Sequence, residues 1–312
     1  MGKLVVLDVD PGIDDALALI MALRSEELEV SAITTVFGNL SLKKTTLNVL
    51  KVLELLKAEV TVARGMARPL KGRRIDAQSI HGKDGLGGAT LPVGRMKPGK
   101  IRAPDLIIEQ ALSTGRRSLT IISTAPLTNI ASALMKEPEV AKKVDRLISM
   151  GGAFGLTRYG YGNQTPVAEF NIYSDPEAAN IVYHSGISIT AVGLDVTMNP
   201  EACLRKEHYA EMQRADTETA RFAVEATRSL MERFGYVALH DPLTVAVAVD
   251  LTLVRTKPFY VDIETKGELT RGQTVVERRS WIMPRKKPNV DICVSVEGKR
   301  FLDLFMDRVI RK

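Results

Sequence analysis

The chain has few of the features that mark secreted, membrane-bound or nucleic-acid-binding proteins. Only two cysteines, Cys203 and Cys293, occur in 312 residues, so a disulfide framework is excluded, although a single bridge between them stays open. No apolar run approaches the roughly 20 residues of a membrane helix, and no basic segment with an apolar one behind it indicates a signal peptide. We therefore expect a cytoplasmic protein without a membrane partner.

Concentrated charge of one sign and aromatic residues are also scarce. The formal net charge is +6, but basic residues are interspersed with acids, and even the densest runs, such as 64–74, are short. A nucleic-acid partner is not expected, because a phosphate-binding surface needs clustered Lys and Arg. Aromatic residues make up 5% of the chain, which leaves few side chains that could stack on a flat ligand.

The hydrophobic pattern predicts an α/β fold. Apolar runs of strand length alternate with helix-period segments. The predicted strands are 4–7, 30–36, 59–63, 119–123, 147–150 and 187–192, and the predicted helices are 13–23, 42–56, 106–113, 126–134 and 176–184. Such alternation implies right-handed crossovers and a mostly parallel central sheet flanked by helices, in a Rossmann-like arrangement.

The later part of the chain has a different pattern. A long amphipathic helix is predicted over 218–234 and a closing helix over 302–310, with a small β region of strands 259–263, 273–276 and 290–296 between them. No repeat or low-complexity linker divides the chain, so we expect one domain over 1–312. The weakly periodic segment 65–100 is too long for an ordinary connection, which favours a functional loop.

Four carboxylates follow the first predicted strand, at Asp8, Asp10, Asp14 and Asp15. Ligands bind at this end of a parallel sheet, and a hard cation such as Ca²⁺ or Mg²⁺ would relieve the repulsion among the acids. The alternative is that these acids only cap a helix, but a capping role would account for one or two acids rather than four. Because Gly12 falls where an EF-hand needs an oxygen ligand, the motif is not of that type. The Asp8-Val9-Asp10 spacing also fits a Mg²⁺-dependent phosphatase of the haloacid dehalogenase type.

Polar residues also follow several later strands. They comprise Ser123 to Asn129, Met150-Gly151-Gly152, then Asn163, Glu169 and Asn171, and His240-Asp241-Pro242. Amides and carboxylates supply both donors and acceptors, which suits a polyhydroxylated ligand. The Gly-rich stretch 79–88 is not a P-loop, since no Lys-Ser or Lys-Thr pair closes it.

As an ordered set, these motifs resemble the inosine-uridine preferring nucleoside hydrolases. The likeness runs through Asp8 to Asp15, Thr34 to Asn39, Ile80-His81-Gly82 and the polar sites above, and extends to Pro176 to Ala179 and Thr270-Arg271-Gly272. The phosphatase interpretation explains only the first of these motifs. The resemblance implies an enzyme with the nucleoside hydrolase fold that releases free base and ribose from ribonucleosides.

The resemblance also implies a role for each matched residue. Ca²⁺ would be held by Asp10, Asp15, Asp241 and the Thr124 carbonyl, with Asp10 also acting as general base on the attacking water. His81 and His240 would face the departing base, and Asp8 would be a structural acid. The ribose would be contacted by Asp14, Asn39, Met150, Asn163, Glu169 and Asn171.

Base preference and assembly are less defined by the sequence. The two histidines resemble the pyrimidine-preferring or broad-specificity branches, whereas the purine-specific branch relies on aromatic stacking. Candidate stacking residues are Phe154, Tyr159, Tyr161, Phe234 and Tyr236, whereas the one tryptophan, Trp281, lies in the late region. A non-catalytic nucleoside-binding protein is the alternative of another class, and the family implies a homodimer or homotetramer.

Overall fold

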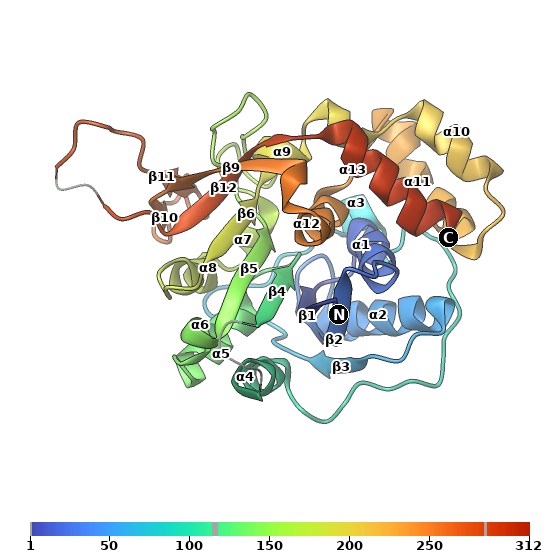
Figure 1. Ribbon diagram of the computed structural model, residues 1–312, viewed down its shortest axis with the longest axis horizontal. Coiled ribbons are helices and arrows are strands. Elements are labelled where there is room, and N and C mark those ends of the chain that lie inside the picture. The colour runs from blue at the N-terminus through green and yellow to red at the C-terminus, as the bar shows by residue number, and fades with distance from the viewer. Residues whose placement is uncertain (1, 114–117, 284–285) are drawn as a thin grey trace.

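The computed structural model describes residues 2–113, 118–283 and 286–312. Its centre is a twisted eight-stranded sheet in the order β3-β2-β1-β4-β5-β6-β12-β9 (Figure 1). In that order the strands are Thr61–Arg64, Leu28–Thr35, Lys3–Val9, Leu119–Ser123, Val144–Met150, Ile189–Val192, Val290–Val296 and Val254–Phe259. All neighbouring pairs are parallel except β12 and β9. The predicted α/β fold with a mostly parallel sheet is confirmed.

Both faces of the sheet are covered by helices, because successive strand residues point to opposite sides. In β1, Val5 and Leu7 join one apolar layer and Val6 joins the other. The first layer contains α1 (Ile13–Leu23), α2 (Leu42–Leu56), α11 (Glu218–Phe234), α12 (His240–Val249) and α13 (Gly298–Phe305). The second contains α4 (Ala103–Ser113), α5 (Thr128–Lys136) and α8 (Pro176–Tyr183).

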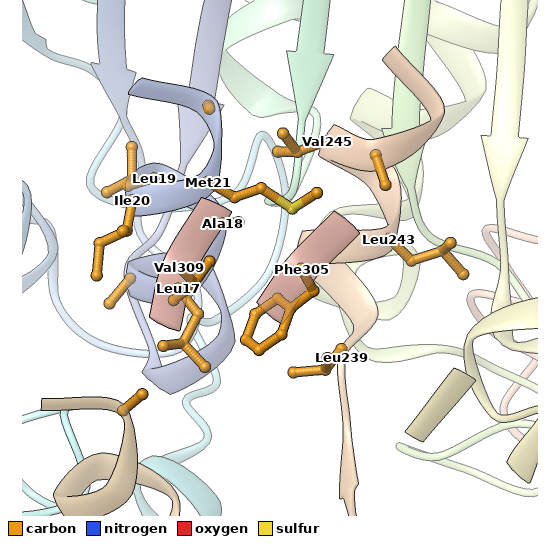
Figure 2. Packing of buried hydrophobic residues seen from close by; sticks show 14 of the residues in the cluster. Leu17, Ala18, Leu19, Ile20, Met21, Leu239, Leu243, Val245, Phe305 and Val309 are labelled. Atoms are coloured by element: carbon orange, nitrogen blue, oxygen red, sulfur yellow. The ribbon is translucent and has the colours of Figure 1, made fainter. Parts of the chain in front are cut away.

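Helix α12 lies at the centre of the first layer and was not predicted from the sequence. Leu243 and Val245 pack there with Met21 of α1 and Phe305 of α13 (Figure 2). Eight of its ten residues are buried, so the helix has no polar face to produce a helical period. Its alternating Val and Ala residues instead imitate a strand. The core residues of α12 hold its first turn, which carries His240 and Asp241, against α1.

The late β region differs from the prediction. Strand β12 pairs with β6 and β9 pairs with β12, so both extend the main sheet. Only β10 (Val261–Ile263) and β11 (Thr274–Val276) form a separate hairpin, and the predicted strand 259–263 is divided between β9 and β10 at Tyr260. The closing helix begins earlier than predicted, as α13, and ends in the π-helical turns η3 (Met306–Arg311).

The remaining elements are short, apart from α10, and connect the main ones. They are α3 (Gln78–His81), α6 (Val140–Lys143), α7 (Phe170–Ser174), α9 (Leu194–Thr197), η1 (Pro200–Ala202), β7 (Cys203–Leu204), α10 (Lys206–Arg214), β8 (Val237–Ala238) and η2 (Leu251–Leu253). Within the described ranges, no helix is long and apolar enough to cross a bilayer. Cys203 and Cys293 are buried, free thiols, so the bridge left open by the sequence does not form.

The strand order reverses direction between β1 and β4. From β1 the chain moves outward through β2 and β3, and it then places β4 on the other side of β1. The loops that leave β1 and β4 therefore diverge at their carboxyl ends, where open α/β sheets bind ligands. The Thr124 N–H donates to the Asp8 carbonyl at 3.0 Å, which ties the two loops together at this point.

Candidate active site

The carboxylate motif folds into a tight turn between β1 and α1. Asp15, in the first turn of α1, accepts the Gly12 N–H at Oδ2 (3.0 Å) and the Asp10 N–H at Oδ1 (3.3 Å). It also accepts the Thr124 hydroxyl at 2.8 Å and the Asn39 side-chain amide at 3.0 Å. These bonds place Asp15 at the meeting point of the loops that follow β1, β2 and β4.

Three carboxylates of this region converge. Oxygen atoms of Asp14, Asp15 and Asp241 lie within 4.8 Å of one another. One Ca²⁺ can reach all three, since its bonds to oxygen are about 2.3–2.6 Å long. Asp10 is outside this closest group, but its charge acts on both Asp15 and Asp241. Its Oδ2 accepts the Asn39 N–H at 2.6 Å.

The electrostatics of this cluster fit a bound cation. In the part of the chain that the structure describes, Asp10 Oδ1 and Asp14 Oδ1 are buried without a hydrogen-bond partner. Burial, followed by the charge of Asp15, raises the pKa of Asp10 well above its ordinary value. Burial, followed by the charges of Asp14 and Asp15, does the same to the pKa of Asp241. A divalent ion would satisfy the free oxygens and remove the repulsion that raises these pKa values.

Asp8 has a different environment from the other three acids of the motif. It is fully buried, and its Oδ1 accepts the Thr34 hydroxyl at 2.6 Å and the Asn129 amide at 2.8 Å. Burial raises its pKa to about 7. Asp8 is thus bound to Thr34 at the end of β2 and to Asn129 in the first turn of α5.

A pocket of about 390 Å³ opens above the carboxylates. Ten of the twelve predicted site residues line it: Asp14, Asn39, His81, Thr124, Met150, Asn163, Glu169, Asn171, His240 and Asp241. The other two, Asp10 and Asp15, are fully buried. Residues that lie up to 227 positions apart in the sequence, from Asp14 to Asp241, therefore share one cavity.

The polar wall opposite α1 is built by α7. Glu169 caps this helix: Oε1 accepts the Asn171 N–H at 2.8 Å, and Oε2 accepts those of Gly152 and Ile172 at 3.1 Å. Gly152 has φ of +92°, a conformation that favours glycine. The side-chain oxygen of Asn163 accepts the Phe170 N–H at 2.9 Å, so its side-chain NH₂ group can donate to a ligand. The Met150-Gly151-Gly152 and Glu169 motifs therefore form one structure.

Thr124 and Asn171 make a contact that bears on the expected metal shell. The Thr124 carbonyl accepts the Asn171 amide at 3.0 Å, and Asn171 also donates to the Met150 carbonyl at 3.3 Å. A carbonyl oxygen has two lone pairs, so the Thr124 oxygen can bind Asn171 and a cation together.

The two pocket histidines have different partners. His81 Nδ1 accepts the Ile13 N–H at 3.1 Å, which places the hydrogen of the neutral ring on Nε2. Burial lowers the pKa of His81 to about 4, so at neutral pH the ring is uncharged and its Nε2–H can donate a hydrogen bond. His240 Nδ1 lies 2.8 Å from the Thr197 hydroxyl, and burial lowers its pKa as well. Neither environment favours a protonated imidazole.

The far end of the pocket is apolar and partly aromatic. Of the five aromatic candidates, Phe234 and Tyr236 line it, together with Ile80, Leu230 and Phe170. Phe154 is a core residue, whereas Tyr161 is 61% exposed and Trp281 75% exposed. A flat ring bound in the pocket would therefore meet the end of α11 and the segment that follows it.

Sequence reasoning missed several residues that shape the pocket. Asp195, which is 1% exposed, accepts the N–H groups of Phe154 (2.8 Å), Leu156 (2.6 Å) and Thr157 (3.0 Å). It thereby fixes the loop that leads to Asn163. Asn48 on α2 is a second such residue, since its amide donates to the Pro11 and Asp84 carbonyls. For Asp195 the available signal was an acid within an otherwise apolar helical turn.

Known proteins with similar sequences and folds belong to one family. The family model described as inosine-uridine preferring nucleoside hydrolase matches residues 5–303. The pyrimidine-specific ribonucleoside hydrolase RihA of Escherichia coli O1:K1 is 39% identical over 98% of this chain and 97% of its own, and that of Salmonella paratyphi C is 40% identical over the same shares.

Solved structures of the same kind match as well. A plant nucleoside hydrolase, PpNRh1, superposes with a TM-score of 0.92 at 32% identity and covers 100% of both chains. The purine-preferring ribonucleoside hydrolase of Gardnerella vaginalis gives 0.89 at 34% identity over 98% of both chains. The phosphatase and binding-protein alternatives are therefore set aside. The chain belongs to the inosine-uridine preferring nucleoside hydrolase family and is an N-glycosidase that acts on ribonucleosides.

Proposed function

We propose that the protein is a Ca²⁺-dependent nucleoside hydrolase with a preference for pyrimidine ribonucleosides. The observation that carries the proposal is the convergence of the carboxylates, amides and histidines predicted from scattered motifs on a single pocket. The preference is supported by the pyrimidine-specific relatives at 39% and 40% identity, which exceed the 34% of the purine-preferring structure.

Ca²⁺ would be held by Asp10, Asp15, Asp241 and the Thr124 carbonyl. These donors are all oxygens, which is the set that a hard cation prefers. When bound, the ion supplies the orientation of the ribose 2′- and 3′-hydroxyls and lowers the pKa of the attacking water. The ion would also explain why several carboxylates are tolerated together in a fully buried position.

The protein's own residues would handle the proton and the sugar. Asp10 accepts the proton of the attacking water through Oδ1, which has no other partner among the described residues. Asp14, Asn39, Asn163, Glu169 and Asn171 bind the ribose hydroxyls, and Met150 packs against the ring. Their negative and dipolar groups stabilise the positive charge that develops at C1′ as the bond breaks. Direct attack by water leaves no covalent intermediate.

His81 and His240 would act on the base that departs with negative charge. With Nδ1 of His81 occupied by the Ile13 N–H, Nε2 is the donor available to the base. A neutral imidazole stabilises the negative charge of the leaving base by donating a hydrogen bond to it. The aromatic residues at the far end of the pocket, Phe234 and Tyr236, would contact the base.

The test is ribose release from uridine, cytidine, inosine and adenosine, each with Ca²⁺ or with excess chelator. The proposal expects release that chelator abolishes and Ca²⁺ restores, with the pyrimidine nucleosides ahead. Asp10→Asn should lose activity, whereas Asp303→Asn on the exposed side of α13 should not. Faster release from inosine would replace the pyrimidine preference by a purine one, and chelator-resistant release would refute the metal requirement.

We also propose that the protein is a homodimer or homotetramer, and light scattering would measure the mass that tests this.

A further inference from the structure

Two loops that carry different parts of the site lie directly against each other. One is the carboxylate turn, defined as residues 10–13, and the other is the histidine loop, defined as residues 77–88. The Ile13 N–H donates to His81, and a Cβ added at Gly12 would come within 2.6 Å of His81 Nδ1. The Ala77 N–H donates to the Asn39 carbonyl at 3.1 Å. The position of His81 over the carboxylates therefore depends on how these loops are held together.

Asn48 connects the two loops from behind. It lies on α2, is 1% exposed and does not line the pocket. Its side-chain nitrogen donates to the Pro11 carbonyl at 3.1 Å and to the Asp84 carbonyl at 2.9 Å. A primary amide has two hydrogens, so both donors are used, one on each loop. Among side chains of this size, only an amide supplies two donors from one uncharged atom.

The Asp84 end of this bridge controls the rest of the histidine loop. Asp84 Oδ1 accepts the Leu86 N–H at 3.1 Å and the Gly88 N–H at 3.3 Å. The Gly87 N–H in turn donates to the His81 carbonyl at 2.9 Å. Gly85 has φ of +83°, and a Cβ there would lie 2.9 Å from the Asn48 nitrogen. The loop is thus shaped to let Asn48 reach its backbone.

We propose that Asn48 is a positioning residue that fixes His81 relative to the carboxylate turn. The inference rests on the proposed function, in which His81 faces the departing base. Loss of the bridge should affect the histidine loop more than the carboxylate turn. The turn keeps its own bonds to Asp15 and Asn39, whereas the other bond from α2 to the loop, Lys44 to the Lys83 carbonyl, is exposed.

The test compares Asn48→Leu with Asn289→Leu on two substrates. Asn289 is the control, because its amide also donates to two carbonyls, those of Tyr183 and Val261, and it does not line the pocket. The substrates are uridine and 4-nitrophenyl riboside, whose nitrophenolate leaves without a proton donor. We expect kcat for uridine to fall by about 10²-fold in Asn48→Leu, and that for the nitrophenyl riboside to fall much less. Asn289→Leu should lower only the unfolding midpoint.

Each result has a defined meaning. An equal fall on both substrates, or no fall on either, refutes the positioning role. Asn48→Ser keeps one donor in a smaller side chain. Its kcat for uridine should fall by less than that of Asn48→Leu, and again more than its kcat for the nitrophenyl riboside. This variant replaces Asn48→Leu in the test if Asn48→Leu does not fold. Wild-type uridine hydrolysis in the same assay tests the proposed function separately, so an active wild type with an unaffected Asn48→Leu refutes only the inference.

Discussion

Gly38 lies directly beneath the carboxylate of Asp10, and adding one methyl group there should disable the site. A Cβ at position 38 would lie 1.8 Å from Asp10 Oδ2 and 2.7 Å from its Cγ. Real Cβ atoms do not approach other heavy atoms within 3.0 Å. The carboxylate in Gly38→Ala must therefore retreat by about 1 Å, a displacement that can reduce an enzyme's rate by about 10²-fold.

The size of this effect follows from what Asp10 would lose. Its retreat breaks the 2.6 Å bond from the Asn39 N–H and moves Oδ1 from both the proposed ion and the attacking water. A 10²-fold loss in kcat/KM corresponds to about 2.7 kcal/mol of transition-state stabilisation. The affinity for Ca²⁺ should fall with it, because a proposed ligand oxygen is displaced.

The assay is kcat/KM for uridine with Ca²⁺ titration, in Gly38→Ala and in a control, Gly99→Ala. A Cβ at Gly99 would meet only the Val62 carbonyl, at an ordinary 3.5 Å, and Ile101. The control should behave as wild type in activity and metal affinity. The assignment of Asp10 to the reaction is refuted if folded Gly38→Ala keeps kcat/KM within about twofold of wild type. Such a change is well below the tenfold that corresponds to about 1.4 kcal/mol.

Three further predictions concern the metal, the core and the pocket loop. Ca²⁺ should raise and chelator should lower the thermal unfolding midpoint, because an ion that binds only the folded protein stabilises it; identical midpoints would contradict the cation site. Phe305→Ala, in the core of Figure 2, should cost about 3–5 kcal/mol in denaturant unfolding, and a loss below about 1 kcal/mol would show that the cavity collapses. Asp195→Ala frees the loop that leads to Asn163, so KM for uridine should rise more than kcat falls, and a pure kcat effect would oppose this view of Asp195.

The sequence by itself determined the α/β class and the nucleoside hydrolase family. Hydrophobic period is a local property, so strands such as β4 and helices such as α2 and α11 were predictable within a few residues. Clustered acids after β1 predicted a cation site for the same reason, because the repulsion among Asp8 to Asp15 is present in any conformation. Hydrophobic period did not predict α12, where burial on all sides removes the polar face that makes a helix recognisable.

Only the tertiary structure decided which groups act together and in which form. Packing between distant segments seated α12 against α1, which brought Asp241 beside Asp14, and set the strand order that made β12 and β9 part of the main sheet. The tautomer of His81 depends on a bond from Ile13, 68 residues away, and its lowered pKa depends on burial. The sequence gives no indication of the role of Asn48, because its bridge between two loops exists only once both loops are folded against the same helix.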